Sequence, residues 1–449
     1  MTTLTAMPKY EAYKDSGVEW IGEIPDDWGI KKLSHLFSNI GSGTTPATGN
    51  ISFYDGNISW LQTGDLTDGV INSTSKTISE RALKTHSTLK QYKAGSLVVA
   101  MYGATIGKVG LLNISTATNQ ACCVLEKTDS VDMRFAFYLF MGFKSNIVAM
   151  GYGGGQPNIS QDLIRNLRFP FPNQQLQTAI ANFLDEKTAK IDEAIAIKER
   201  QIALLKERKQ IIIQQAVTQG LDPTVPMKDS GVEWIGKIPA HWSYPSKLKY
   251  LSTLKGRQGW QGLKAEEYRD EGPHVLSSAH FNNYVIEWDK CPRVSMERYL
   301  MDEHIQLKVS DVLLMKDGAN MGKLAYVDSL PGLACLNSHL LLFRSLNNEN
   351  IPFFHSKYMF FHMMIDQFQD YVKVNGTGST FLGISQESIG NYKIALPPLD
   401  EQVLIAQFLD KTTFEFDKCI SKFEVQIEKL KEYKSTLINS AVTGKIKVV

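Results

Sequence analysis

Glycine-rich turns that carry polar side chains are the segments of this sequence whose residue types could do chemistry. Gly103–Lys108 and Gly318–Lys323 share the pattern Gly-x-x-x-Gly-Lys. A phosphate-binding loop needs four residues between its glycines and a Ser or Thr after the lysine, and here only three residues intervene before Val109 or Leu324 follows. The pattern therefore favours a tight turn between strands over a nucleotide site. The two lysines remain candidates for contact with a DNA phosphate.

Further turns offer side chains that could read base edges. In 256–264, Arg257 has the chemistry for guanine, and Gln258 and Gln261 have the chemistry for adenine. Polar turns also occur at 41–46 and 60–65. The glycine loops 151–156 and 375–380 could approach a sugar-phosphate backbone, because glycine permits close contact.

Each of these segments also has a structural interpretation, as a solvated turn or a plain connector, and we expect Trp60 and Trp260 to be packing residues. The candidate DNA contacts are Thr44, Thr45, Gln62, Thr63, Tyr102, Lys108, Gln156, Arg257, Gln258, Gln261, Lys264, Lys316, Lys323 and Thr377.

Residues that would carry out a reaction are missing from the sequence. No amino-methyltransferase motif, nucleophile elbow or zinc spacing occurs, so we expect no enzyme activity and no metal or cofactor bound by this chain. The five cysteines form no CxxC pair, which indicates a reduced, cytoplasmic setting. No signal peptide or membrane-spanning stretch is present. The net charge of +1 neither supports nor excludes nucleic acid, because a local basic face can be hidden in the sum.

An internal duplication organises the elements that must position these turns. Residues 14–25 return at 228–239 with eleven identities in twelve, 214 residues later. A second set of matches follows at an offset of 225, including Ile159-Ser-Gln and Ile384-Ser-Gln. The order is a short shared segment, a variable middle and a longer shared segment, repeated once. Such a chain can present two separately tunable surfaces to a partner such as DNA.

Each longer shared segment is predicted to be a long helix, because apolar or small residues recur every three or four positions over many turns. About 44 residues at 1.5 Å each would give a rod of roughly 65 Å. An antiparallel coiled coil of the two helices is the economical arrangement, and packing of each helix on its own neighbouring domain is the alternative. The first seam contains Ile180, Leu184, Thr188, Ile191, Ile195, Ile202, Leu205, Ile212 and Ala216. The second seam contains Ile405, Leu409, Thr413, Phe416, Ile420, Phe423, Ile427, Leu430, Leu437 and Ala441.

The variable middles are predicted to be mixed α/β. Short apolar runs separated by turn residues indicate strands at 58–61, 96–101 and 122–125, and at 274–276, 311–315 and 339–343. An aromatic-rich helix is expected at 135–143 and at 353–368. The two variable middle segments are best explained by one common fold whose surface residues differ.

The arrangement resembles the specificity subunit of type I restriction–modification systems. The resemblance covers nearly the whole chain. It is carried by the doubled Ser-Gly-Val-Glu-Trp-Ile-Gly-x-Ile-Pro, the Gly-Thr-Thr-Pro turn at 43–46, Asn119-Gln120, and the Pro-x-x-x-x-Gln segments 172–177 and 397–402. In the second copy, 256–260 replaces the Gly-Thr-Thr-Pro turn, so contacts cannot be carried over from one copy to the other by position.

This resemblance implies two α/β (α+β) target recognition domains joined by two long helices in an antiparallel coiled coil with pseudo-two-fold symmetry. The expected bounds are 1–172 for the first domain, 173–220 for the first helix, 221–397 for the linker and second domain, and 398–449 for the second helix. Each domain would read one half of a bipartite, asymmetric site in double-stranded DNA. Two methyltransferase and two restriction subunits are the implied partners, with S-adenosylmethionine, ATP and Mg on those partners. A self-sufficient DNA methyltransferase or nuclease and a protein-only coiled-coil scaffold are the competing interpretations.

Overall fold

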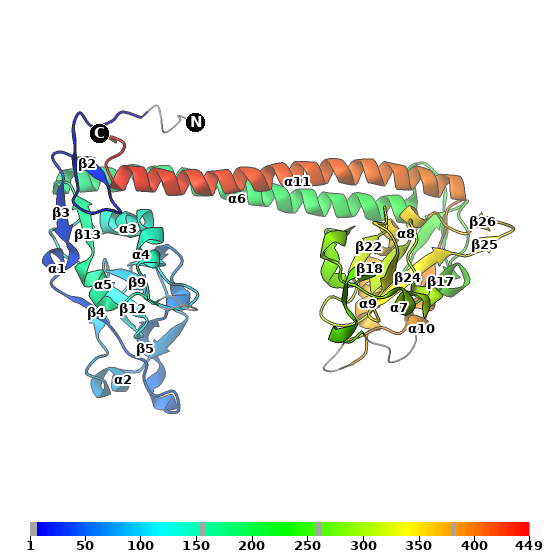
Figure 1. The fold of residues 1–449 in the computed structure, drawn as a ribbon, viewed down its shortest axis with the longest axis horizontal. Helices are drawn as coiled ribbons and strands as arrows, with labels where there is room; N and C mark the ends of the chain where they lie inside the picture. Colours follow the sequence, from blue (N-terminus) through cyan, green and yellow to red (C-terminus); the bar gives the residue numbers. More distant parts are fainter. Residues whose placement is uncertain (1–6, 153–157, 257–262, 379–381, 449) are drawn as a thin grey trace. The chain divides into compact units, whose positions relative to one another are not determined.

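The computed structural model describes residues 7–152, 158–256, 263–378 and 382–448. These residues form two compact units. Unit 1 comprises 1–199 together with 424–449, and unit 2 comprises 200–423 (Figure 1). Unit 1 therefore combines the N-terminal half of the chain with its C-terminal end.

Unit 1 is a mixed α/β structure. Its principal sheet has the strand order β4-β12-β9-β10-β6, and a second sheet has the order β7-β5-β11-β8. The strands are β1 (Tyr13–Asp15), β2 (Glu23–Pro25), β3 (Gly29–Lys32), β4 (Ile40–Ser42), β5 (Tyr54–Leu61), β6 (Gly69–Ile71), β7 (Lys76–Ile78), β8 (Gln91–Tyr92), β9 (Leu97–Ala100), β10 (Val109–Leu112), β11 (Thr116–Thr118), β12 (Cys122–Leu125) and β13 (Arg168–Phe171). The short helices are α1 (Leu33–Leu36), α2 (Glu80–Thr85), α3 (Met133–Gly142), α4 (Lys144–Ala149) and α5 (Gln161–Asn166), with 3-10 turns η2 (Ile51–Phe53) and η3 (Thr63–Asp65).

Unit 2 is also mixed α/β. Its principal sheet has the order β17-β24-β21-β22, beside the parallel pair β18-β23. The strands are β14 (Met227–Asp229), β15 (Lys237–Pro239), β16 (Ser246–Lys247), β17 (Ser252–Lys255), β18 (Arg269–Leu276), β19 (Phe281–Asn282), β20 (Val285–Ile286), β21 (Val312–Met315), β22 (Leu324–Tyr326), β23 (Ala334–Leu336), β24 (Leu340–Ser345), β25 (Asn347–Asn348), β26 (Ile351–Pro352) and β27 (Lys393–Ile394). The short helices are α7 (Met296–Leu300), α8 (Ser356–Met363), α9 (Asp366–Val374) and α10 (Gln386–Gly390), with 3-10 turns η4 (Leu248–Tyr250), η5 (Ala265–Glu267), η6 (Ser278–His280), η7 (Trp288–Lys290) and η8 (Glu303–Ile305).

The two units share one strand frame. β9 pairs antiparallel with β12, placing Ala100 opposite Cys122, and β21 pairs with β24 in the same way, placing Met315 opposite Leu340. β4 and β17 take the outer position next to β12 and β24, and β10 and β22 follow on the other side. The prediction of mixed α/β domains with a common frame is confirmed, and the six strands expected from apolar runs are all present.

The aromatic helix of each unit packs on this frame. In unit 1, α3 lies against β9 and β10, and its N-cap Asp132 accepts hydrogen bonds from the backbone N–H of Arg134 and Phe135. In unit 2 the prediction of a single helix at 353–368 is wrong. Its residues form α8 and the start of α9, because the backbone of Ile365 leaves the helical region and takes ψ of 152°.

Two long helices, α6 (Gln174–Gln219) and α11 (Leu399–Val442), contribute to both units. Within unit 1, Lys434 Nζ lies 2.7 Å from Asp192 Oδ2, and Lys198 Nζ lies 2.6 Å from Gln426 Oε1. Because the higher-numbered residue of α6 meets the lower-numbered residue of α11, the two segments run antiparallel. In unit 2, Lys209 of α6 forms the corresponding ion pair with Asp417 of α11, at 2.7 Å.

The ends of these helices also belong to the cores of the units. Ile180 and Leu184 of α6 and Leu437 and Ala441 of α11 are buried in the core of unit 1, together with aromatic residues of α3 and β13. Ile213 of α6 and Ile405 and Leu409 of α11 are buried in the core of unit 2. Mid-helix seam residues such as Ile202 and Leu205 are half-buried. The helices thus pair with each other and also pack on their own domains, so both arrangements weighed from the sequence are present.

The duplicated segment forms a hairpin at the helix ends in each unit. β1 pairs with β2, and β14 pairs with β15, in matching registers. Gly444, at the end of α11, has φ of 73°, and an added Cβ there would lie 2.4 Å from Pro25. Gly220, at the end of α6, has φ of 78° and packs close to Trp242. Only glycine fits such a helix end without strain, so the prediction that this segment packs near the helix ends is confirmed.

Candidate nucleic-acid interface

The Gly-x-x-x-Gly-Lys segments are tight turns between neighbouring strands. Gly107 N–H donates to Ala100 O over 2.9 Å, and Gly322 N–H donates to Met315 O over 2.8 Å. Both glycines of each turn have positive φ, from 75° to 92°. The turns join β9 to β10 and β21 to β22, which confirms the structural interpretation of the pattern.

A capped 3-10 turn lies beside each of these turns in the strand frame. In unit 1, Gln62 N–H donates to Asp65 Oδ2 over 2.8 Å at the start of η3, and in unit 2, Ser277 N–H donates to His280 Nδ1 over 3.1 Å at the start of η6. Asn119 N–H donates to Leu61 O just before η3, and Asn337 N–H donates in the same way to Leu276 O before η6. Both asparagines also accept a hydrogen bond from the N–H two residues later. In both units, the strand frame therefore holds the 3-10 turn next to the shared asparagine position, η3 next to Asn119 in unit 1 and η6 next to Asn337 in unit 2.

The glycine loops are closed by the same backbone bonds. Tyr152 and Asn158 exchange hydrogen bonds of 2.9 and 2.8 Å, and Thr377 and Gly383 exchange hydrogen bonds of 2.8 and 2.9 Å. The next residue in each case, Ile159 or Ile384, donates to a carbonyl next to the Gly-Lys turn, that of Met101 or Lys316. The base of each loop is thus hydrogen-bonded to the strand frame next to the Gly-Lys turn.

The shared Ile-Ser-Gln motif explains how the loop is anchored. Ser160 and Ser385 are the N-caps of α5 and α10, and each side chain accepts from the backbone N–H three residues later. Gln161 Nε2 donates to Ile40 O over 3.1 Å, and Gln386 Nε2 donates to Leu254 O over 2.7 Å. The repeated motif therefore closes the frame in the same way in both units.

In unit 1 the turns bring polar side chains together at Gln120. Thr45 Oγ1 donates to Gln120 Oε1 over 2.6 Å, and the Gln120 side chain also acts on the pKa of Tyr102. Burial raises the pKa of Tyr102, and the Gln120 side chain partly offsets that effect. Gln120 is exposed, whereas Thr45 and Tyr102 are half-buried. Amide, hydroxyl and phenol groups of this kind provide donors and acceptors for base edges.

Gly43 fixes the approach of the first turn to this cluster. Its N–H donates to Thr118 Oγ1 over 3.1 Å, and an added Cβ would lie 1.7 Å from Thr118 O. A side chain at this position cannot be accommodated without moving the backbone. The glycine of the Gly-Thr-Thr-Pro turn is therefore required for the position of Thr44 and Thr45.

In unit 2 the corresponding positions carry charge. Asp317 replaces Tyr102 in the frame, and its carboxylate pairs with Lys316 Nζ at 2.6 Å and with His339 Nδ1. The side chain of His339 is 45% exposed. Lys323 Nζ donates to Ser278 O over 3.3 Å. The same frame thus presents neutral hydrogen-bonding groups in unit 1 and ionised groups in unit 2.

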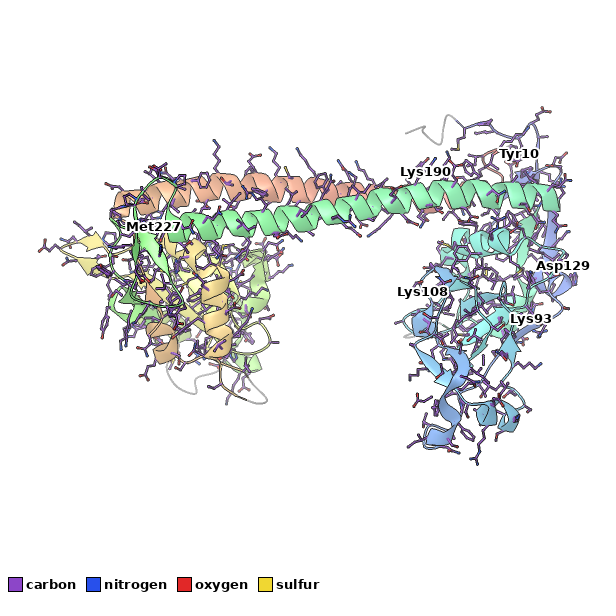
Figure 2. The ribbon with its side chains drawn as sticks, turned by 180° about the vertical axis from the view of Figure 1, so that it is seen from behind. Tyr10, Lys93, Lys108, Asp129, Lys190 and Met227 are labelled. Atoms are coloured by element: carbon purple, nitrogen blue, oxygen red, sulfur yellow. The ribbon has the colours of Figure 1, made fainter. Side chains whose placement is uncertain are left out.

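The remaining candidates are scattered around these clusters. Lys108, which is labelled in Figure 2, is half-buried at the end of its turn in unit 1. Its side chain forms no ion pair within the part of the chain that the structure describes. Lys264 and Thr377 are exposed, and Lys264 N–H donates to Glu267 Oε2. Gln62 and Thr63 lie at η3. The candidates Gln156, Arg257, Gln258 and Gln261, and the packing prediction for Trp260, lie outside the described residues. Trp60 is 1% exposed, which confirms it as a packing residue.

Three residues of these clusters were missed as candidates: Gln120, Asp317 and His339. Gln120 could have been found, because Asn119-Gln120 is one of the motifs that carry the family resemblance. Nothing in the local sequence marks Asp317 or His339, since their pairing depends on the registers of β21 and β24.

No group of three or more His, Cys, Asp or Glu able to hold a metal ion occurs in the described part of the chain. No helix among those residues is long and apolar enough to cross a membrane. All five cysteines are free, and burial raises the pKa of Cys123 to about 12.

Comparisons with known proteins give a consistent result. The family described as the type I restriction modification DNA specificity domain matches residues 25–207 and 279–429. The chain is 23% identical to the type I restriction enzyme MjaVIII specificity subunit of Methanocaldococcus jannaschii, over 95% of this chain and 94% of that protein. It is 25% identical to the MjaIX specificity subunit of the same organism, over 95% of each chain.

Solved structures show the same fold. A chain from a structure of a type I restriction–modification system, described for its complex assembly and conformational transition, has a TM-score of 0.72 and 16% identity. The match covers 94% of this chain and 99% of that chain. The HsdS subunit from Thermoanaerobacter tengcongensis has a TM-score of 0.51 and 15% identity, over 94% of this chain and 98% of that chain.

Proposed function

The chain belongs to the type I restriction–modification DNA specificity family, and from that premise we propose that unit 1 and unit 2 each read one half of a bipartite, asymmetric DNA target. As a specificity subunit, the chain recognises DNA sequence and is a non-catalytic component of its complex. The family match disfavours the self-sufficient enzyme and the protein-only scaffold.

One observation carries the proposal of two different half-sites. The loops around Gln120 and around Asp317 are held by equivalent backbone bonds, yet their side chains differ in both type and charge. Direct readout depends on the donors and acceptors that a loop presents to base edges. Two loops in one frame with different chemistry should therefore bind different sequences.

The glycine loops and the lysines of the turns supply contacts to the DNA backbone in this proposal. Backbone contacts fix register and orientation, while base contacts carry the sequence information. Lys108 and Lys323 end equivalent turns, so they suit a common backbone-positioning role. The other residues predicted from the sequence to contact DNA, including Thr44, Gln62, Lys264 and Thr377, belong to the same proposed surface.

We propose that the recognition units act as modules. Exchange of residues 240–375 for the corresponding segment of another family member should change the half-site read by unit 2 and leave the other half unchanged. Methylated adenines mapped across a host genome before and after the exchange would give both half-sites directly. A change in both halves would contradict the proposal.

The long helices set the spacer between the half-sites in this proposal. One turn of B-DNA is about 34 Å, so half-sites about one turn apart present the same groove face. Insertion of one helical turn into both α6 and α11 should alter the preferred spacer. An unchanged spacer on libraries with variable gaps would contradict this role of the helices.

Catalysis is supplied by partners. Two methyltransferase subunits would act on adenine with S-adenosylmethionine, and two restriction subunits would use ATP and Mg. We also propose a cytoplasmic location for the assembly, where its DNA substrate is present. Purified chain incubated with S-adenosylmethionine and target DNA should give no methylation until the methyltransferase subunit is added.

A further inference from the structure

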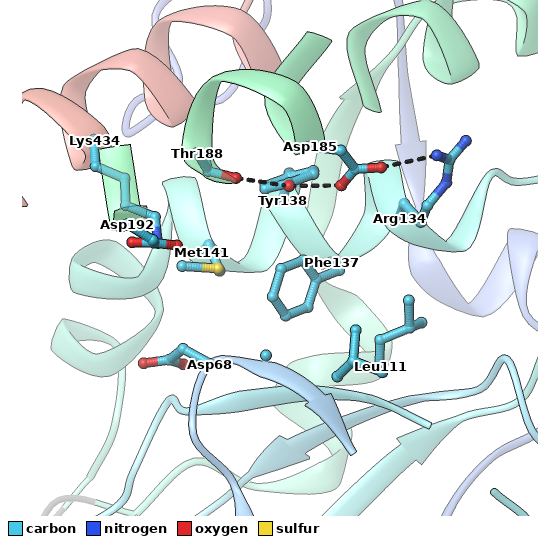
Figure 3. A pocket seen from close by; sticks show the side chains of 12 residues that line it. Asp68, Leu111, Arg134, Phe137, Tyr138, Met141, Asp185, Thr188, Asp192 and Lys434 are labelled. Atoms are coloured by element: carbon cyan, nitrogen blue, oxygen red, sulfur yellow. Dashed lines mark hydrogen bonds and ion pairs between the residues drawn. The ribbon is translucent and has the colours of Figure 1, made fainter. Parts of the chain in front are cut away.

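One tyrosine of unit 1 is exposed at the candidate DNA surface. The side chain of Tyr152 is 77% exposed, whereas the other described tyrosines of unit 1 are buried or half-buried. Tyr138 is an example of the usual case. It is 5% exposed, and its hydroxyl donates to Asp185 Oδ1 over 2.7 Å where α3 faces α6 (Figure 3). Packing within unit 1 therefore does not explain the Tyr152 ring.

The backbone of Tyr152 is fixed although its ring is exposed. Its N–H donates to Asn158 O over 2.9 Å, and its carbonyl accepts from Asn158 N–H over 2.8 Å. On its other side Asn158 pairs antiparallel with Tyr102. The next residue, Ile159, donates to Met101 O over 2.7 Å. Tyr152, Asn158 and Tyr102 thus form a short ladder, and this ladder ties the exposed ring to the strand frame.

The ladder places the Tyr152 ring beside the polar cluster formed by Thr45, Tyr102 and Gln120. Residues directly opposite each other in an antiparallel pair carry their side chains on the same face. The side chains of Tyr152, Asn158 and Tyr102 therefore share one face. Pair spacings of about 5.5 and 4.5 Å place the Cα of Tyr152 about 10 Å from the Cα of Tyr102. A DNA segment that reaches the polar cluster also lies within reach of the ring.

Unit 2 repeats the ladder without an aromatic ring. Thr377 and Gly383 exchange hydrogen bonds of 2.8 and 2.9 Å, and Gly383 pairs with Asp317 on its other side. Thr377 thus takes the position that Tyr152 has in unit 1. Because the same backbone bonds form with a small side chain, the frame does not require an aromatic residue at this position.

An exposed ring on a fixed backbone suits contact with the flat face of a base. Aromatic side chains stack on bases, and side chains inserted between base pairs unstack and kink the duplex at that step. Pyrimidine–purine steps are the easiest to unstack. Such a contact uses the π-face of a base, so it is distinct from hydrogen bonding to base edges at Gln120.

We propose that the Tyr152 ring inserts at one base step in the half-site read by unit 1 and stacks on a base there. The ring makes unit 1 sensitive to how easily that step unstacks, and Thr377 gives unit 2 no such contact. Since about 10 Å corresponds to about three base pairs, the step lies about three base pairs from the base contacted by the polar cluster. The inference rests on the proposed function, because it requires unit 1 to bind one half of the target.

The test uses the full chain assembled with its methyltransferase subunits and bound to duplexes of the mapped target. A fluorescent base, 2-aminopurine or pyrrolocytosine, replaces one base at a time within about four base pairs of the position that Gln120→Ala affects. Its fluorescence reports changes of base stacking. The adenine that is methylated is left unsubstituted, because methyltransferases extrude their target base.

The variants are Tyr152→Ala and Tyr152→Phe. Tyr244→Ala is a matched control in unit 2, because the Tyr244 side chain is 67% exposed and lies beside Lys228, outside the candidate DNA surface. Thr377→Ala is the control at the equivalent position of the second ladder. Thermal unfolding confirms that each variant is folded.

Binding of the wild-type complex should change the fluorescence at one base step of the half-site read by unit 1. Tyr152→Ala should abolish this change and weaken binding by about 5- to 150-fold, the range expected for one base–aromatic stack. Tyr152→Phe should retain both properties, because the ring remains. Among duplexes that differ only at this step, the wild-type complex should prefer pyrimidine–purine steps, and Tyr152→Ala should lose that preference. Both controls should behave as the wild type.

Unchanged fluorescence and affinity in Tyr152→Ala would overturn the inference. Equal losses in Tyr152→Phe and Tyr152→Ala would also overturn it, since the hydroxyl and not the ring would then contact DNA. A step preference that persists in Tyr152→Ala would exclude the role in specificity. Failure of the wild-type complex to bind its target specifically would refute the proposed function itself, a result distinct from an unchanged Tyr152 variant.

Discussion

Replacement of Gln120 by alanine is the most direct probe of the candidate DNA surface. Gln120 is exposed and joins Thr45 and Tyr102, so its amide is the group of this cluster best placed to reach a base edge. Folding should be little affected, because the two partners can be solvated after its removal. DNA recognition should be affected much more.

The magnitude follows from the chemistry of the contact. A good amide contact to a base edge is worth about 1–3 kcal/mol of discrimination. Since 1.4 kcal/mol corresponds to about tenfold, Gln120→Ala should weaken binding to the mapped target by about 5- to 150-fold. The loss should be confined to one half-site, because Gln120 lies in unit 1.

The assay is titration of the assembled complex against fluorescent duplexes with single-base changes in either half, at one fixed salt concentration. The variant should lose discrimination in the half read by unit 1 and keep it in the other half. Gln174→Ala is a matched control. Gln174, at the start of α6, is also exposed, but its side chain donates to the Asp129 carbonyl and lies outside the candidate DNA surface. Equal losses at both half-sites, or unchanged discrimination, would refute the assignment of Gln120 to base recognition.

Three further perturbations test the frame. Gly43→Ala should destabilise unit 1 by about 1–3 kcal/mol in urea unfolding, because the added Cβ would clash with Thr118 O. Gly64→Ala is the control and should have a small effect, because the space around Gly64 is open. Equal effects of the two substitutions would contradict the predicted clash. Gln402→Leu should cost unit 2 about 1–3 kcal/mol, because the His355 N–H and the Pro397 carbonyl lose their hydrogen bonds with the Gln402 amide, and a neutral result in the same assay would be inconsistent with that role. Burial lowers the pKa of His362 to about 3 in the folded protein, below the ordinary value of 6.5. Between these two pH values the unfolded protein binds more protons at this residue than the folded protein does. The free energy of unfolding therefore falls as the pH falls through that window. Between pH 7.5 and 5.5 this residue should account for about 1.4 kcal/mol of lost stability, and His362→Gln should lower the pH dependence by that amount.

Sequence patterns predicted the local parts of this fold well. Apolar runs gave the six strands, and the three-and-four spacing gave α6 and α11, because both patterns reflect burial along one element. The break between α8 and α9 was missed, since a continuous apolar and aromatic composition hides a change of backbone direction at Ile365.

The candidate site was predicted less completely. Gln120 meets Thr45 across 75 positions, and His339 meets Asp317 across 22, so their pairing follows from strand register. A local pattern contains no information about register between distant strands. The turn lysines and the glycine loops could be identified, because their signals lie within a few residues.

The buried glutamines of the Pro-x-x-x-x-Gln segments are another case of this kind. The Gln177 side chain bonds the Pro172 carbonyl and the Asp132 N–H, and the Gln402 side chain bonds the Pro397 carbonyl and the His355 N–H. The sequence marks both segments as related. Only the structure shows that each amide fixes the start of the aromatic helix on the long helix.

The frame around the loops is closed largely by main-chain hydrogen bonds, such as those from Asn119 to Leu61 and from Ile384 to Lys316. Main-chain donors and acceptors are present whatever side chain a residue carries. Mutations at the loop side chains therefore leave the scaffold intact, and each half-site can drift to a new sequence by single substitutions. The DNA target of this protein could therefore change through substitutions in the loops without passing through an unfolded intermediate.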